Sequence, residues 1–281
     1  MPMHKDAVRL SAGQSLVDRS ALKANAQLSL QLVRREISTR YRGTVLGVVW
    51  SLLTPLMMLA VFTFVFGTVF RARWSGMSDT ASTGEFAVIL FAGLIIFQFF
   101  AEVVSQAPSV MLANQNYVKK VVFPLETLIP VAVGSALFHF GVSLIVLISF
   151  IIVVFGGIPS TALLAPVVLV PLVILLLGLG WFLASFGTYV RDIGQVIGTL
   201  VTAMMFLSPI FFPLSSLPDW IQPFILLNPI SIPVTEFRNV MVFGTAPAVV
   251  PLLLYTIVAA AIAWLGYTWF QKTKKGFADV L

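Results

Sequence analysis

Residues 34–56 read RREISTRYRGTVLGVVWSLLTPL and place four arginines directly before a long apolar run. Because arginine and lysine collect on the cytoplasmic side of membrane helices, this boundary is typical of a chain entering a bilayer from the cytoplasm. Guanidinium groups also bind phosphate in a fork-shaped geometry, so the same arginines are candidates for docking an anionic molecule. The stretch alone is compatible with both interpretations.

The composition of the chain defines its broad class. Of the 281 residues, 59% are hydrophobic and 10% are charged, whereas roughly a quarter of the residues of an ordinary soluble protein are charged. The sequence therefore predicts an all-α polytopic membrane protein. Its net charge of +6 is explained by basic loops rather than by binding of nucleic acid. Cysteine is absent, which excludes disulfides and thiol chemistry.

The motifs of several enzyme classes are missing from the sequence. It contains no HExxH, no GxSxG, no paired aspartates and no Walker A P-loop. His139 stands alone in an apolar stretch, where a packed, hydrogen-bonded histidine is commoner than a ligand. We therefore expect no catalytic site and no cofactor in this chain. If transport uses ATP, another polypeptide must bind the ATP and its magnesium.

Six apolar stretches are long enough to be candidates for crossing a bilayer, which needs about 20 residues of helix. They lie near 46–70, 86–106, 129–155, 161–186, 195–212 and 247–270. Fourteen of the 17 lysines and arginines fall on the side that holds both termini, and Arg71, Arg73 and Arg238 fall on the other. By the positive-inside rule, both termini are predicted to be cytoplasmic, with a cytoplasmic region at residues 1–45 and the transmembrane domain at residues 46–281.

The segment 208–237 is too apolar for a free loop and too rich in proline for a straight spanning helix. We predict that it forms short re-entrant helices that dip back from the outer face, where irregular backbone must be covered by protein or line a cavity. The alternative is an amphipathic loop on the lipid surface. Trp220, which follows Pro218 and Asp219, is suited to an interfacial helix start in the first arrangement.

Polar side chains recur within the apolar stretches. Gln98 and Glu102 share a helix face, and a glutamate at such a depth marks a functional site unless it reaches water or a basic partner. In the first stretch, small residues at four-residue spacing favour a close helix-packing seam; they are Gly43, Gly47, Ser51 and Thr54. Thr199, Thr202 and Phe206 form a stripe whose hydroxyls and aromatic ring suit a carbohydrate path, although packing explains each residue taken singly.

Three stretches resemble the membrane subunits of type-2 ABC exporters that move polysaccharides, including O-antigen, capsule and teichoic-acid exporters. They are 34–56, ANQNYVKKVVFPLETLIP at 113–130, and LNPISIPVTEFRNVMVFG at 227–244. The resemblance implies a homodimer in the bacterial inner membrane, paired with two copies of a soluble nucleotide-binding ATPase. It also implies a lipid-linked glycan as substrate. An O-antigen-like glycan is preferred, and capsular polysaccharide and teichoic acid are the alternatives. The resemblance further implies that 113–126 couples to the ATPase and that an amphipathic helix within 1–45 lies along the cytoplasmic interface before the first span.

The resemblance assigns roles to four sets of residues. Coupling to the ATPase is expected from Arg34, Arg35, Asn116, Tyr117, Lys119, Lys120, Phe123, Pro124 and Glu126. The substrate entrance is expected at Arg40, Tyr41 and Arg42, and the substrate path at Trp50, Ser51, Thr54, Phe62, Gln98, Glu102, Thr199, Thr202 and Phe206. The outer gate is expected at Phe211, Phe212, Trp220 and Asn228.

Two other classes fit the sequence less well. An ion-coupled secondary transporter is expected to carry more buried charge and internal repeats, and the chain shows no convincing repeat. A membrane-embedded transferase would need acidic residues in pairs, which the chain lacks.

Overall fold

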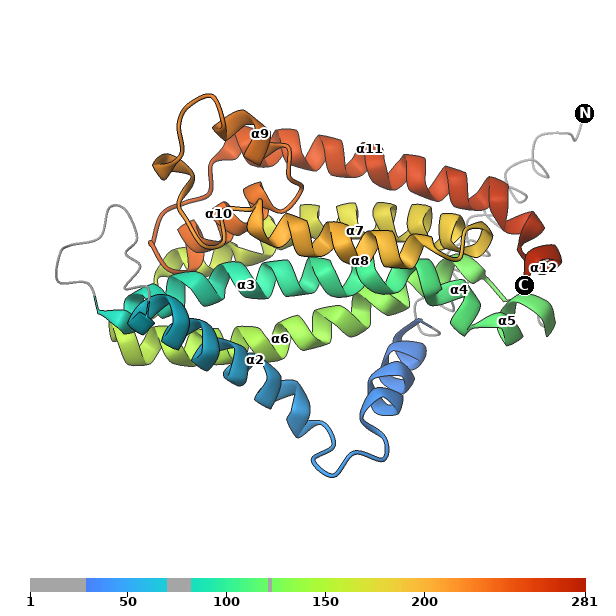
Figure 1. Cartoon of the computed structure of the whole chain (residues 1–281), viewed down its shortest axis with the longest axis horizontal. Helices are drawn as coiled ribbons and strands as arrows, with labels where there is room; N and C mark the ends of the chain where they lie inside the picture. The colour runs from blue at the N-terminus through green and yellow to red at the C-terminus, as the bar shows by residue number, and fades with distance from the viewer. Residues whose placement is uncertain (1–28, 70–81, 121–122) are drawn as a thin grey trace, which may run out of the picture.

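The computed structural model describes residues 29–69, 82–120 and 123–281. These ranges form helices joined by turns and contain no strand (Figure 1). Five helical segments are long and apolar enough to cross a membrane: Val49–Val69, Thr83–Ala113, Leu125–Phe155, Ser160–Tyr189 and Val249–Val280. The prediction of an all-α polytopic protein is therefore confirmed. The predicted tail at 1–28 lies outside the described residues.

The bundle is built around α3 (Thr83–Gln106), most of whose residues are buried. It packs against α6 (Leu128–Phe155), α7 (Ala165–Tyr189) and α8 (Ile193–Phe206). The last long helix, α11 (Val249–Thr273), packs mainly along α7. Because α3 is enclosed, polar groups on it must find partners within the protein.

Glycines of α7 and α11 let these two helices approach closely. A Cβ atom added to Gly266 would lie 2.1 Å from the carbonyl oxygen of Gly178, so only glycine fits there. The predicted seam in the first span is wrong. Gly43 and Gly47 lie in turns with φ of 83° and 53°, because α2 (Val49–Phe62) begins only after them. These two positions let the chain turn from the helix at 29–41 into α2.

The predicted span at 195–212 is also corrected by the structure. The helix there, α8, has 14 residues and ends at Phe206. Pro209 and Pro213 follow, and proline cannot donate the backbone hydrogen bond that would continue the helix. The chain then forms two further helices, α9 (Gln222–Leu226) and α10 (Ser231–Met241).

The two ends of the bundle carry different elements (Figure 1). At one end lie α9 and α10, and α10 packs into the bundle against α3 and α7. At the other end lie α4 (Val110–Ala113), α5 (Gln115–Lys120) and the C-terminal α12 (Phe277–Val280). The fold therefore places the predicted gate segment and the predicted coupling segment at opposite ends. The re-entrant depth of 208–237 in a bilayer stays a prediction.

Residues 29–41 form a helix, which we call the N-terminal helix. Its Val33 packs against α6 at Gly134, where an added Cβ atom would lie 2.8 Å from the Cγ2 atom of Val33. Figure 1 shows this helix and α2 projecting from one side of the bundle and joined by a turn. Its location in the membrane interface stays a prediction.

Candidate functional site

A polar cluster joins the N-terminal helix to two spanning helices. Arg40 forms an ion pair with Glu102 of α3, and the Nδ1 atom of His139 on α6 lies 2.8 Å from the same carboxylate. The hydroxyl of Tyr41 lies 2.9 Å from His139 Nε2. If Nδ1–H donates to Glu102, then Nε2 accepts the hydrogen bond of Tyr41, so one tautomer satisfies both contacts.

The members of this polar cluster differ in their exposure to solvent. The side chains of Glu102 and His139 are each 16% exposed, whereas Arg40 is 44% exposed. The structure shows a basic partner for Glu102, Arg40, which is one of the two alternatives that the sequence left open. His139, the second partner of Glu102, was not predicted from the sequence, because their pairing depends on which face of α6 meets α3.

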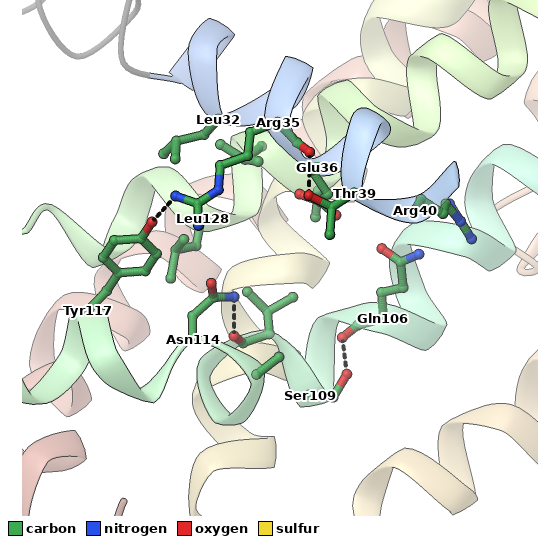
Figure 2. Close-up of a pocket in the computed structure, with 14 residues that line it drawn as sticks. Leu32, Arg35, Glu36, Thr39, Arg40, Gln106, Ser109, Asn114, Tyr117 and Leu128 are labelled. Carbon is green, nitrogen blue, oxygen red and sulfur yellow. Dashed lines mark hydrogen bonds between the residues drawn. The ribbon is translucent and has the colours of Figure 1, made fainter. Parts of the chain in front are cut away.

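A cavity of about 510 Å³ lies beside the cluster, between the N-terminal helix, α4, α5 and the start of α6 (Figure 2). Its wall includes Arg35, Arg40 and Tyr117, so the predicted coupling and entrance residues meet at one place. Arg35 donates a hydrogen bond of 3.1 Å to the hydroxyl of Tyr117, which ties the N-terminal helix to α5. Burial raises the pKa of Glu36, on the same wall, and Arg40 opposes that shift.

The remaining coupling residues divide into a surface set and a packed set. Arg34, Asn116 and Lys119 are exposed, while the side chain of Lys120 lies outside the described part. Phe123 stacks on Tyr117 with ring centroids 4.7 Å apart. Pro124 is half-buried beside it. The exposed set lies at the surface, where its role in binding an ATPase stays a prediction, and the packed set holds α5 in position.

Glu126 connects the coupling segment to the end of the chain. Its carboxylate lies 3.2 Å from the ammonium of Lys274, and its backbone carbonyl accepts a hydrogen bond from the indole of Trp181. Phe277 is fully buried beyond Lys274, with its ring against Phe270. Glu126 therefore braces the segment rather than presenting a free charge.

At the opposite end, aromatic rings from three segments gather. The ring of Phe211 lies 5.9 Å from that of Phe62 on α2 and 5.8 Å from that of Phe206 on α8. We call these three residues the aromatic cluster. Phe212 is half-buried, and Trp220 is 71% exposed. The structure thus brings together two residues predicted for the path and one predicted for the gate.

Asn228 acts as a local structural anchor in this region. Its amide donates to the backbone carbonyls of Met204 and Leu207, each at 3.2 Å, and these carbonyls belong to the end of α8. The carbonyl oxygen of Pro229 accepts a hydrogen bond of 2.9 Å from the hydroxyl of Tyr255 on α11. The Asn-Pro pair therefore fastens the end of α8 and the start of α10 to α11.

The other path residues lie on two exposed helix faces. Trp50 and Thr54 are exposed on α2, and Thr199 and Thr202 are exposed on α8. Gln98 is half-buried on α3, and Arg42 is exposed before α2. Ser51 is buried and its hydroxyl donates to the carbonyl of Val48, and its place in the path stays a prediction.

The fold and these sites define a polytopic helical membrane protein whose two bundle ends carry separate polar and aromatic machinery. Comparison of the sequence makes the class specific: residues 27–242 match the family described as ABC-2 type transporter, and the chain belongs to that family.

Its relatives include named export permeases. The chain is 27% identical over 259 residues to the O-antigen export system permease protein RfbA of Myxococcus xanthus, covering 90% of this chain and 94% of the relative. A protein of the same name from Klebsiella pneumoniae is 25% identical over 257 residues. The polysialic acid transport protein KpsM of Escherichia coli is 29% identical over 204 residues, covering 71% of this chain and 75% of the relative. The resemblance to polysaccharide ABC exporters is therefore confirmed.

Proposed function

We propose that this chain is the membrane-spanning permease subunit of an ATP-driven exporter that moves a lipid-linked O-antigen-type polysaccharide across the bacterial cytoplasmic membrane. The observation that carries the proposal is the match over 94% of the length of the M. xanthus O-antigen permease. The chain itself is a transport subunit. ATP and magnesium are assigned to a separate soluble subunit.

A capsular polysaccharide is the second candidate substrate. It is favoured by the similarity to KpsM, which covers 75% of that relative. The O-antigen permeases are matched more completely, which is why an O-antigen-type glycan comes first. The two candidates share one architecture and differ in the glycan that the exporter accepts.

The assembly we propose contains two copies of this chain and two ATPase subunits. The exposed apolar face of α2 supports a second copy as its cover, because its exposed residues include Trp50, Met57 and Val61. The exposed hydroxyls of Thr199 and Thr202 on α8 would then face the glycan between the copies. In this arrangement α8 and the 208–237 segment together make the sixth crossing, and both termini are cytoplasmic.

Coupling follows from the contacts at the cavity. The ATPase would press on the exposed face of α5 at Asn116 and Lys119. Tyr117 would pass the movement to Arg35 of the N-terminal helix through their hydrogen bond. Arg40, one turn further along, would carry it into α3 through Glu102. A single rigid helix thus links the cytoplasmic surface to the most buried helix of the bundle.

The polar cluster is also suited to the substrate entrance. Arg40 is partly exposed and lines the cavity, so its guanidinium can attract the phosphate groups of a lipid carrier. When Arg40 turns toward phosphate, Glu102 keeps His139 as a partner and is not left as an unpaired buried charge. Tyr41 and Arg42 lie next to Arg40 along the chain.

The proposal is tested with the purified complex of this chain and its cognate ATPase. We expect a stable complex whose ATP hydrolysis rises when lipid-linked O-antigen-type glycan is added. A larger rise with capsular glycan would favour the second candidate. A protein that purifies without an ATPase and transports after ATP depletion would refute the assignment to an ABC exporter.

A further inference from the structure

A buried arginine lies at the base of the gate segment. Arg238 belongs to α10, and its side chain is 2% exposed. Charged side chains are rarely buried in a membrane bundle unless their donors are satisfied. The structure shows what this guanidinium binds: backbone carbonyl groups of two segments that are distant in the sequence.

The guanidinium joins α3 to the irregular backbone after α8. Its Nε atom donates to the carbonyl of Ile89 on α3 at 2.8 Å, and Nη2 donates to the carbonyl of Ile210 at 2.6 Å. Nη1 donates to the carbonyl of Pro209. Because α8 ends at Phe206, the carbonyls of Pro209 and Ile210 lie beyond its hydrogen-bond ladder. Arg238 supplies donors that a regular helix would otherwise provide.

The space around the guanidinium is fitted to it. A Cβ atom added to Gly93 of α3 would lie 2.3 Å from Nη2 and 2.9 Å from Cζ of Arg238. Glycine at position 93 therefore lets the planar group lie directly against α3. Any larger residue would force the guanidinium away from its carbonyl partners.

The helix that carries Arg238 is itself fixed at its end. The carboxylate of Glu236 accepts a hydrogen bond of 2.9 Å from the backbone N–H of Ala248, just before α11. The hydroxyl of Thr161 donates to the carbonyl of Val240 at 2.8 Å. Because α10 is held in this way, Arg238 has a fixed position and anchors the segment that it binds.

We infer that Arg238 is a positioning residue that fixes the segment 207–213 against α3 and thereby sets the place of Phe211 in the aromatic cluster. Calling this segment the outer gate rests on the proposed function. The planar fork of arginine is required, because three carbonyls lie in different directions and the ammonium of lysine presents one point charge. The charge alone is therefore insufficient.

The absence of cysteine from the chain allows a direct test. Ser208 lies in this segment and is fully buried, so a Ser208→Cys variant reports the opening of the segment to a membrane-impermeant maleimide. In nanodiscs, adding Arg238→Lys should raise the labelling rate about tenfold, because weakened charged hydrogen bonds shift a local opening equilibrium by that order. A Ser135→Cys reporter, 1% exposed on α6, should keep its rate.

A second variant tests the same contact without changing the arginine. Gly93→Ala should also raise labelling of the Ser208→Cys reporter, whereas Gly141→Ala on α6 should not, since an added Cβ at Gly141 meets nothing within 4 Å. Unchanged labelling in both Arg238→Lys and Gly93→Ala would overturn the inference. An equal rise at the Ser135→Cys reporter would also overturn it, because it would indicate general loosening. The measurement needs neither ATPase nor glycan, so it tests the role of Arg238 even if the proposed function is wrong.

Discussion

The ion pair between Arg40 and Glu102 predicts how firmly the N-terminal helix is held to the bundle. The substitution Glu102→Gln keeps the shape of the side chain and removes its charge. Arg40 is 44% exposed, so we take the pair near the upper value for exposed ion pairs, about 1 kcal/mol, rather than the larger value of a fully buried pair. Loss of this amount would raise the detached fraction of the helix about fivefold.

The detached fraction can be measured at Val33. This side chain packs against Gly134 of α6, so a maleimide reaches the thiol of a Val33→Cys variant when the helix lifts. We expect the labelling rate of this reporter to rise about fivefold with Glu102→Gln. The docked state has its own check. A Cβ atom at Gly134 lies 3.8 Å from the Cβ of Val33, which is the ordinary spacing in a disulfide, so the double cysteine variant should oxidise readily.

A matched control lies on the same helix. Glu85 is in the first turn of α3, at the end far from the cluster, and Glu85→Gln should leave labelling at position 33 unchanged. The reasoning is refuted if Glu102→Gln has no effect on labelling, or if Glu85→Gln raises it equally.

Three other predictions concern separate parts of the protein. Replacing Lys119 and Lys120 by glutamate should weaken binding of the ATPase in a pull-down while leaving the fold intact by circular dichroism; unaltered binding would remove them from the docking surface. Gly266→Ala should destabilise the bundle by about 1–3 kcal/mol in denaturant unfolding, because the new methyl meets the carbonyl of Gly178; an unchanged midpoint would contradict this close approach. Glu36 has a raised pKa in the folded protein, so its contribution to docking of the N-terminal helix is present below its ordinary pKa of about 4.5 and is lost as pH rises through the raised value. Protection of the N-terminal helix from proteolysis should therefore fall with rising pH, and Glu36→Gln should flatten this dependence. The same pH profile in the variant and the unmodified protein would argue against this role of Glu36.

Much of the fold could be predicted from composition and breaker residues. The long apolar stretches predict the spanning helices, because bilayer thickness and helix geometry fix the length that a span requires. The Gly156-Gly157 turn marks the end of one of them, α6. The fifth span was misjudged because hydropathy counts Leu207 and Ile210 as favourable and takes no account of Pro209 between them. The seam of small residues was misjudged because spacing assumes a helix, and Gly43 and Gly47 have left it.

Some site residues could be predicted from the sequence and others could not. Glu102 was identified because a carboxylate in an apolar stretch demands a partner. His139 was missed, because its role depends on which face of α6 meets α3, and tertiary packing alone decides that. Arg238 was read from the sequence as a loop charge on the outer side. Its contacts with Ile89 and Ile210 depend on how α10 folds back into the bundle, which local patterns do not encode.

The central claim is that this chain forms the membrane path of an ATP-driven polysaccharide exporter. The most direct measurement uses vesicles that contain the chain and its cognate ATPase, with lipid-linked glycan on the ATPase side and a lectin that reports glycan on the other. The account predicts that glycan reaches the lectin only when hydrolysable ATP is supplied, and that an ATPase-inactive complex gives no signal. Arrival of glycan at the same rate without ATP, or no arrival with an active complex and matched glycans of both kinds, would contradict it.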